Sequence, residues 1–109
     1  MKLLRLFLVL LVSTNILSQS NVAGGRVYGT VQDQENNPIS KAKVEAIEIN
    51  KGIKYSTFTE QKGNFLLDFL NVGKYKIIIS AEGYNPIEYE FQLKLGSQNN
   101  FTFTLQKFG

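Results

Sequence analysis

The side chains of this sequence that could carry acid–base chemistry are carboxylates and lysines, because it contains no histidine and no cysteine. A base that titrates near neutral pH would therefore have to be a buried carboxylate or lysine. Glu88 and Glu90 stand two residues apart, so in an extended strand both project from the same face. Paired carboxylates could indicate glycosidase chemistry, but an outward sheet face offers no cleft for a sugar ring. We interpret the pair as a solvated polar face, predict no catalytic residue, and do not expect an enzyme.

Metal and cofactor chemistry is equally sparse in the sequence. Without cysteine or histidine, disulfide frameworks, iron–sulfur clusters and the usual zinc sites have no ligands. One segment, with Asp33, Glu35, Asn36 and Asn37, could offer oxygen ligands to calcium. Its spacing matches no EF-hand loop, and these residue types are equally typical of a turn. No metal and no cofactor are therefore predicted.

The first twenty residues have the layout of a secretory signal peptide. Lys2 and Arg5 precede an apolar run over residues 6–12, which polar residues follow. The run is too short for a transmembrane helix, which needs about 20 apolar residues. Cleavage is expected after Ser18 or Ser20, which gives a signal peptide over residues 1–20 and a mature domain over 21–109. We therefore expect a protein that is periplasmic or secreted in a Gram-negative bacterium, with no transmembrane segment in the mature chain.

The net charge of the sequence changes when this leader is removed. Twelve basic and nine acidic residues give +3, a balance that could suggest a nucleic-acid partner. Two of the basic residues, Lys2 and Arg5, belong to the leader, so ten basic and nine acidic residues remain. The ten are scattered and form no stripe that could follow a phosphate backbone. No nucleic-acid partner is predicted.

Beyond residue 20 the apolar residues recur with the period of two that is typical of β-strands. Seven segments qualify, over residues 26–32, 42–49, 54–60, 64–70, 74–82, 87–93 and 101–105. The second segment is ambiguous, because Ile47 and Ile49 have the opposite parity to Ala42, Val44 and Ala46; a bulge could rotate its end. Turn residues punctuate the chain about every ten positions, as in sandwiches and barrels. The sequence predicts one all-β domain, a seven-stranded antiparallel β-sandwich.

Nine residues occur in an order and spacing that resemble the carboxypeptidase regulatory-like domain family over residues 25–105. They are Gly29, Thr57, Thr59, Gly63, Phe65, Leu67, Gly73, Tyr75 and Gly83. The resemblance implies a transthyretin-like or prealbumin-like Greek-key sandwich. In this family the domain is often attached to a zinc carboxypeptidase, or lies N-terminal to the plug and barrel of an outer-membrane receptor. Activity carried by such attached parts does not transfer to this chain.

Elementary physical chemistry accounts for several of these positions independently. Gly63 and Gly73 fall where hairpin turns need a positive φ, and Gly29 allows another backbone or a ring to approach its strand. The hydroxyls of Thr57 and Thr59 are expected to bond backbone near the following turn. Five apolar side chains are expected to fill the space between the sheets: Phe65, Leu67, Leu70, Tyr75 and Ile77.

Three functions remain open at this stage, all of them non-catalytic. The favoured one is an exported structural or protein-interaction module of the cell envelope or the exterior. The first alternative is a carbohydrate-binding module, in which Tyr28, Phe58 and Tyr84 offer aromatic rings to a sugar. The second alternative is a stand-alone relative of the N-terminal extension of TonB-dependent outer-membrane receptors. The expected partner is accordingly an envelope protein or a glycan, and the oligomeric state is left open.

Overall fold

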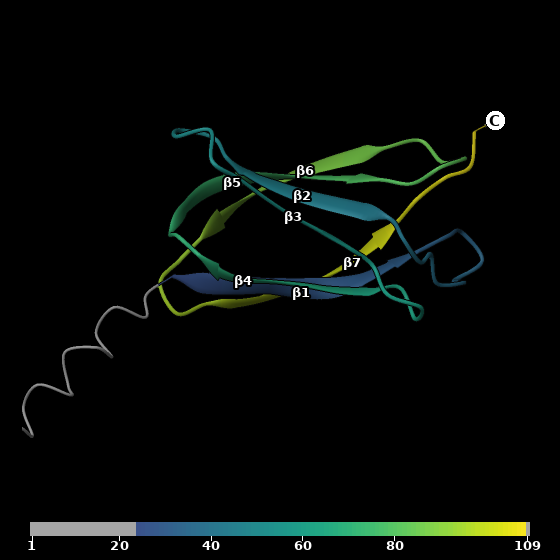
Figure 1. Ribbon diagram of the computed structural model, residues 1–109, viewed down its shortest axis with the longest axis horizontal. Helices are drawn as coiled ribbons and strands as arrows, with labels where there is room; N and C mark the ends of the chain where they lie inside the picture. Colours follow the sequence, from purple (N-terminus) through teal and green to yellow (C-terminus); the bar gives the residue numbers. More distant parts are fainter. Residues whose placement is uncertain (1–23, 109) are drawn as a thin grey trace, which may run out of the picture.

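The computed structural model describes residues 24–108 of the 109-residue chain. The predicted signal peptide, residues 1–20, with its cleavage sites at Ser18 and Ser20, lies outside the described residues. Figure 1 shows seven β-strands: β1 (Gly25–Gln32), β2 (Lys43–Glu48), β3 (Lys54–Phe58), β4 (Asn64–Leu70), β5 (Gly73–Ser80), β6 (Ile87–Leu93) and β7 (Gln98–Thr104). The predicted all-β, seven-stranded sandwich is confirmed. In these described residues no helix is long and apolar enough to cross a membrane.

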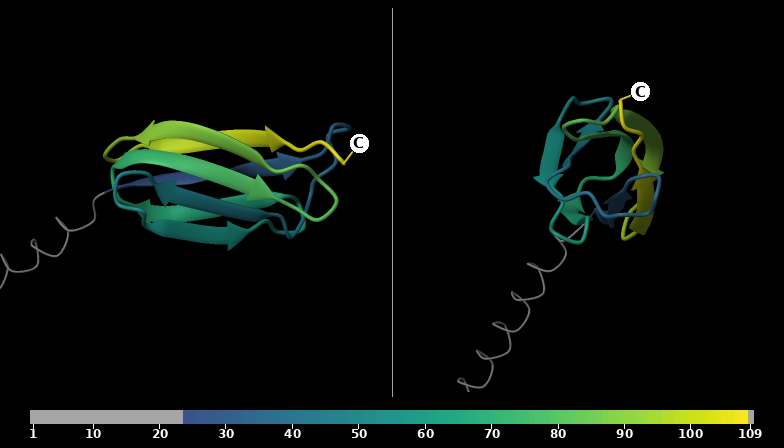
Figure 2. Two further views of the ribbon diagram at one scale, coloured as in Figure 1. Left: turned by 90° about the horizontal axis from the view of Figure 1, so that it is seen from above. Right: turned by 90° about the vertical axis from the view of Figure 1, so that its right-hand side faces the viewer.

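The strands form two sheets that face each other (Figures 1 and 2). One has three strands in the order β4-β1-β7, and the other has four in the order β3-β2-β5-β6. All neighbours pair antiparallel except β1 and β7, which run parallel from Arg26↔Gln98 to Gln32↔Thr104. The three-stranded sheet is therefore mixed, and the prediction of an antiparallel sandwich is wrong for this one pair. Since β1 and β7 lie at opposite ends of the described chain, no local turn in the sequence indicates their pairing.

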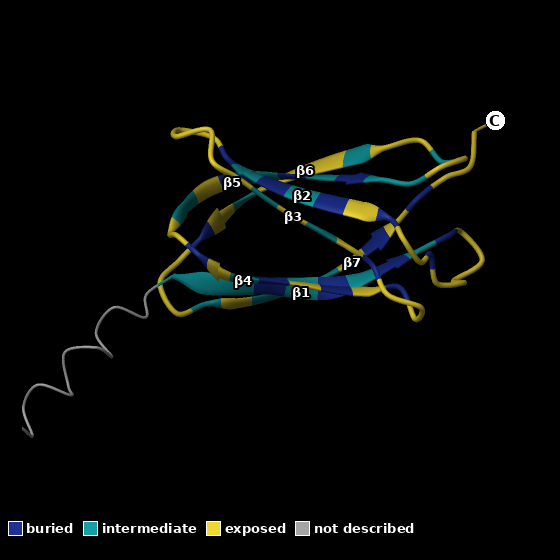
Figure 3. Cartoon of the chain, in the orientation of Figure 1, coloured by how far each residue is buried: buried dark blue, intermediate teal, exposed yellow. Residues whose placement is uncertain are grey.

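The core lies between the two sheets, and buried and exposed residues alternate along most strands (Figure 3). All five side chains predicted to fill it are buried: Phe65, Leu67, Leu70, Tyr75 and Ile77. The fully buried Tyr75 stacks on Phe91 at 5.9 Å between ring centroids, and its hydroxyl donates to the Asn71 carbonyl at 2.7 Å. Burial raises the pKa of Tyr75, so the phenol stays protonated at physiological pH.

A bulge in β4 explains how Leu70 reaches the core although its parity differs from that of Phe65 and Leu67. The register with β1 shifts between Val27↔Leu67 and Gly25↔Leu70, which leaves one extra residue on β4. Phe69 takes the left-handed conformation, with φ of +60°, and is 70% exposed. The bulge thus turns Phe69 out to solvent and Leu70 into the core.

The end of β2 contains no such bulge, and the suggested rotation of this strand is wrong. Its register with β3 and β5 runs without a break, so Val44, Ala46 and Glu48 point inward while Ile49 is 40% exposed. Unbroken alternation therefore carries a carboxylate into the interior. Glu48 is buried against Gly73, and its Oε1 has no hydrogen-bond partner among the described residues.

Two glycines of the family pattern have clear steric reasons. Gly63 has a φ of +78° in the turn before β4, and a Cβ there would lie 2.6 Å from the Val31 carbonyl oxygen. Gly29 lies inside β1, where a Cβ would collide with the carbonyl group of Phe101 on β7. The predicted close approach at Gly29 is thus confirmed. The predicted positive φ at Gly63 is also confirmed, but the predicted hairpin is wrong, because this turn joins β3 and β4, which belong to different sheets.

The two threonines of the pattern differ in their hydrogen bonds. The buried Thr59 Oγ1 accepts the Ala42 N–H at 2.9 Å and donates to the Ile39 carbonyl at 2.6 Å. Its backbone N–H also donates to the Ala42 carbonyl, and its carbonyl accepts the Lys41 N–H, both at 2.9 Å. The predicted bond from the Thr59 hydroxyl to the backbone is thus confirmed. Its partners were expected near the following turn, but they lie in the loop between β1 and β2. For Thr57, no side-chain hydrogen bond is found within residues 24–108.

Candidate binding surface

The outer face of the four-stranded sheet is covered by charged side chains of both signs. Lys43 pairs with Glu45 at 3.6 Å, and Lys76 pairs with Glu88 at 3.7 Å. Both Glu88 and Glu90 are exposed, which confirms that this carboxylate pair belongs to a solvated polar face. Exposed ion pairs of this kind contribute little to stability. The charged side chains of this face are instead in contact with water.

The outer face of the three-stranded sheet is almost free of charge, and we call it the neutral face. Register places Tyr28 between Leu66 on β4 and Asn100 on β7. The neighbouring rows are Asn64–Thr30–Thr102 and Asp68–Arg26–Gln98. Amides and hydroxyls, which can both donate and accept hydrogen bonds, therefore surround one central aromatic ring.

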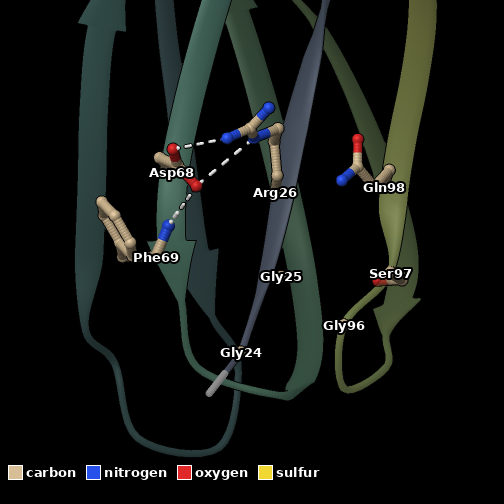
Figure 4. Close-up of a pocket in the computed structure, with 8 residues that line it drawn as sticks. All are labelled: Gly24, Gly25, Arg26, Asp68, Phe69, Gly96, Ser97 and Gln98. Atoms are coloured by element: carbon tan, nitrogen blue, oxygen red, sulfur yellow. Dashed lines mark hydrogen bonds and ion pairs between the residues drawn. The ribbon is translucent and has the colours of Figure 1, made fainter. Parts of the chain in front are cut away.

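Two adjoining hollows shape the neutral face. The larger is a shallow depression of about 600 Å³, lined by residues that include Tyr28, Leu66 and Asn100. The smaller, of about 230 Å³, lies at the end of the sheet where Gly24, Gly96 and Ser97 approach Arg26 (Figure 4). Arg26 and Gln98 line both hollows. The two therefore offer one continuous, open surface rather than an enclosed pocket.

An ion pair between β1 and β4 neutralises the two charged side chains that lie in these rows of the described strands. Arg26 Nη2 lies 3.0 Å from Asp68 Oδ2, and its Nε donates to Asp68 Oδ1 at 3.4 Å. The hydrogen bond from Arg26 lowers the pKa of Asp68, helped by the Phe69 N–H, which donates to Oδ1 at 2.9 Å. The bulge at Phe69 therefore holds Asp68 opposite Arg26. Figure 4 shows the Phe69 ring pointing away from the loop that carries Gly96 and Ser97.

The structure does not bring together the three aromatic residues predicted as possible ligand contacts. Tyr28 is half-buried at the centre of the neutral face. Phe58 is 59% exposed at the end of β3 in the four-stranded sheet, where it lies next to Lys43 on β2. Tyr84 lies between β5 and β6, packs against the core and forms a bridge with Lys107. Of the three, only Tyr28 lies on the neutral face.

Sequence reasoning missed the polar partners of Tyr28. Alternation along β7 already indicates that Asn100 and Thr102 point away from the buried Phe103. It does not indicate that β7 lies beside β1, or that Asp68 reaches Arg26 across 42 positions of sequence. Both facts depend on pairing between distant strands, for which a single sequence carries no local signal.

The oxygen-rich loop after β1 uses its carboxylate to form a turn. Asp33 Oδ1 accepts the N–H groups of Glu35 and Asn37, each at 2.9 Å. The backbone hydrogen bond from Asn37 is the main cause that lowers the pKa of Asp33. In residues 24–108 no group of three or more histidine, cysteine, aspartate or glutamate side chains could hold a metal ion. In the segment where calcium ligands were considered, the Asp33 carboxylate thus accepts the backbone hydrogen bonds that form a turn.

Two stacked sheets, an all-β core and a flat outer face define a β-sandwich domain that presents open surfaces. The chain matches the carboxypeptidase regulatory-like domain family over residues 26–106. It therefore belongs to that family, as the resemblance of its glycines, threonines and core residues predicted. No curated protein matches the chain in sequence.

Several solved structures are similar in fold. The 3-chlorocatechol 1,2-dioxygenase of Rhodococcus opacus 1CP aligns with a TM-score of 0.63 at 14% identity, over 78% of this chain and 60% of that enzyme. The Bacillus anthracis TIE protein aligns with a TM-score of 0.66 at 18% identity, over 78% of this chain and 17% of that one. A streptococcal ancillary pilin aligns with a TM-score of 0.62 at 15% identity, over 79% of this chain and 33% of that one. At such identities these likenesses show the fold alone.

Proposed function

We propose that this domain is a non-catalytic exported binding module that contacts its partner through the neutral face. The observation that carries the proposal is the contrast between the two outer faces. One face is covered with charged side chains, whereas in the described rows of the other face the charged side chains are Arg26 and Asp68, which neutralise each other in the row next to Tyr28. Depletion of unpaired charge around an aromatic residue is typical of interaction surfaces. The family supports a module without chemistry of its own.

A carbohydrate is the ligand class that the neutral face favours among the partners considered. Sugars offer many neutral hydroxyls, and the amides of Asn64, Gln98 and Asn100 can donate to them and accept from them. An aromatic ring such as Tyr28 can pack against the apolar face of a pyranose. An open, shallow depression suits a polymer that lies along a surface better than a small molecule that must be enclosed. An envelope protein remains the other partner class.

The test is a titration of residues 21–109 with neutral oligosaccharides, namely glucans, mannans and xylans, followed by calorimetry and amide NMR shifts. We expect shifts on β1, β4 and β7, and loss of binding in Tyr28→Ala. Phe58→Ala is the matched control, because it removes an exposed ring from the opposite sheet and should leave binding unchanged. A flat titration with every glycan would exclude the carbohydrate. Cross-linking in envelope extract that depends on Tyr28 but not on Phe58 would then support a protein partner.

Export is a separate part of the proposal and needs its own test. Lys2, Arg5 and the apolar run that follows support it. Fractionation of the producing cells should place the protein in the periplasm or the medium. N-terminal sequencing of that protein should begin at Gln19 or Asn21, according to which serine is the cleavage site. Cytoplasmic protein that retains Met1 would contradict export.

A further inference from the structure

The four edge strands of the sandwich are not equally protected against pairing with another strand. Natural sheets protect their edges with charges, prolines and bulges. Three of the edges follow this rule: β3 carries Lys54, β4 carries Asp68 and the bulge at Phe69, and β6 carries Glu88 and Glu90. The fourth edge, β7, has the sequence QNNFTFT, without charge, proline or glycine, and its register with β1 is unbroken over seven pairs. Among the described strands, β7 is the unprotected edge.

Hydrogen bonds at the two ends of β7 define which of its backbone groups are free. The Arg26 N–H donates to the Ser97 carbonyl at 3.0 Å, and the Leu105 N–H donates to the Gln32 carbonyl at 2.9 Å. The odd-numbered residues of β7 therefore form the ladder to β1, and the even-numbered residues direct their N–H and C=O groups away from it. The outward groups belong to four residues: Gln98, Asn100, Thr102 and Thr104.

We propose that β7 pairs antiparallel with β7 of a second copy of this chain, with Phe101 of each copy on the two-fold axis. In this register Gln98 lies opposite Thr104 and Asn100 opposite Thr102 of the other copy. Every outward backbone group then meets an outward group, as hydrogen-bonded antiparallel pairs require. Sliding one β7 along the other by one residue would place outward backbone groups opposite inward ones. Sliding it by two residues would leave outward groups at the strand ends without a partner. The strand is thus complementary to itself, which is what an isologous dimer needs.

Apolar side chains beside this edge favour the same contact. Tyr89 on β6 is 46% exposed, and its ring lies 5.2 Å from Phe101 and 6.1 Å from Phe103 between centroids. A second copy at β7 would cover this exposed side of the aromatic cluster, while no charged side chain of β7 would face another. In Figure 2, β7 lies at a lateral side of the sandwich. The dimer would join the two three-stranded sheets into one of six strands.

Paired charge variants test the register itself. Residues 24–108 form a complete sandwich with its own core, so the experiment uses residues 21–109 in sedimentation at rising concentration. The wild-type domain should show a monomer–dimer equilibrium. In the variant Asn100→Lys with Thr102→Lys, lysines face each other twice across the axis, and association should weaken by about tenfold or more. In Asn100→Lys with Thr102→Glu, each lysine faces a glutamate of the other copy, so association should return to near the wild-type level.

Amide exchange supplies a second readout that a change in folding would not reproduce. In concentrated wild-type protein the amides of Gln98, Asn100, Thr102 and Thr104 should become protected, whereas on dilution they should exchange freely. The odd-numbered amides of β7 should be protected at both concentrations. A wild-type domain that stays monomeric to about 1 mM, or equal weakening in both double variants, would overturn the proposal. Protection of the even amides by an added foreign peptide, without self-association, would also overturn it and assign the edge to a peptide.

Discussion

Replacing Thr59 with valine removes a hydroxyl that holds the loop between β1 and β2, but keeps the shape of the side chain. The hydroxyl bonds both the Ala42 N–H and the Ile39 carbonyl in a site that is 4% exposed. Valine can make neither bond, and no other partner of these two groups is found among the described residues. Both backbone groups would then be left unpaired.

The expected loss follows from the cost of burying unpaired polar groups. Each orphaned group costs about 1–3 kcal/mol, and the added methyl group recovers about 0.8 kcal/mol. The two groups together cost about 2–6 kcal/mol, so the net loss in the free energy of unfolding should be about 1–5 kcal/mol, out of a total of roughly 5–15 kcal/mol for a domain. For a domain of this size, Tm should fall by roughly 4–8 °C for each kcal/mol that is lost.

Two matched variants separate the hydrogen bonds from the packing. Thr59→Ser keeps the hydroxyl and loses a methyl group, so it should cost about 1 kcal/mol. Thr57→Val makes the same change two residues earlier, inside β3, at a half-buried hydroxyl without such bonds, and should alter stability by about 0.5 kcal/mol or less. Urea and thermal unfolding of residues 21–109 measure all three. If Thr59→Val is as stable as Thr59→Ser, hydrophobic burial outweighs the hydroxyl, and our account of the loop is wrong.

Three further changes test the core, the bulge and the acid stability. Phe65→Ala should cost about 3–5 kcal/mol, because the ring is buried and stacks on Phe103; an unchanged melting temperature would contradict the core. Phe69→Gly should gain about 0.5–1 kcal/mol in urea unfolding by relieving the left-handed conformation, whereas Phe69→Ala, which keeps the strain, should not. The pKa of Asp33 is lowered from 3.8, so its carboxylate stabilises the fold above that pH and loses this effect as the pH falls. Asp33→Asn should therefore flatten the acid side of a plot of Tm against pH.

Strand existence and the inward face of most strands could be predicted, because alternation is a local property of the sequence. The pattern failed where one residue breaks the alternation, and where an unbroken pattern buries a charge. At β4 the extra residue Phe69 lets Leu70 face inward, a change that depends on pairing with β1. At β2 the opposite happened: apolar Ile49 suggested a rotation, yet the sheet register kept Glu48 inside.

The candidate surface was harder to predict than the fold, because its parts are distant in sequence. Tyr28 could be singled out as an outward ring, but Asn64 and Asn100 join it only through the pairing of β4 and β7 with β1. Tyr84 illustrates the converse. Its position in a loop suggested exposure, whereas the bridge to Lys107 and contact with the core leave it half-buried.

The proposed ligand surface and the proposed dimer edge share the same strand, so their tests must be separable. Gln98 and Asn100 line the depression with their side chains, while their backbone groups lie on the free edge of β7. Tyr28 lies one strand away from that edge, so Tyr28→Ala should reduce ligand binding without changing the mass of the assembly. Thr102→Pro does the reverse, because it removes an outward N–H without touching the ladder to β1; Thr102→Val keeps that N–H and is its control. A ligand that still binds the monomeric Thr102→Pro domain would show that each copy carries a complete binding surface.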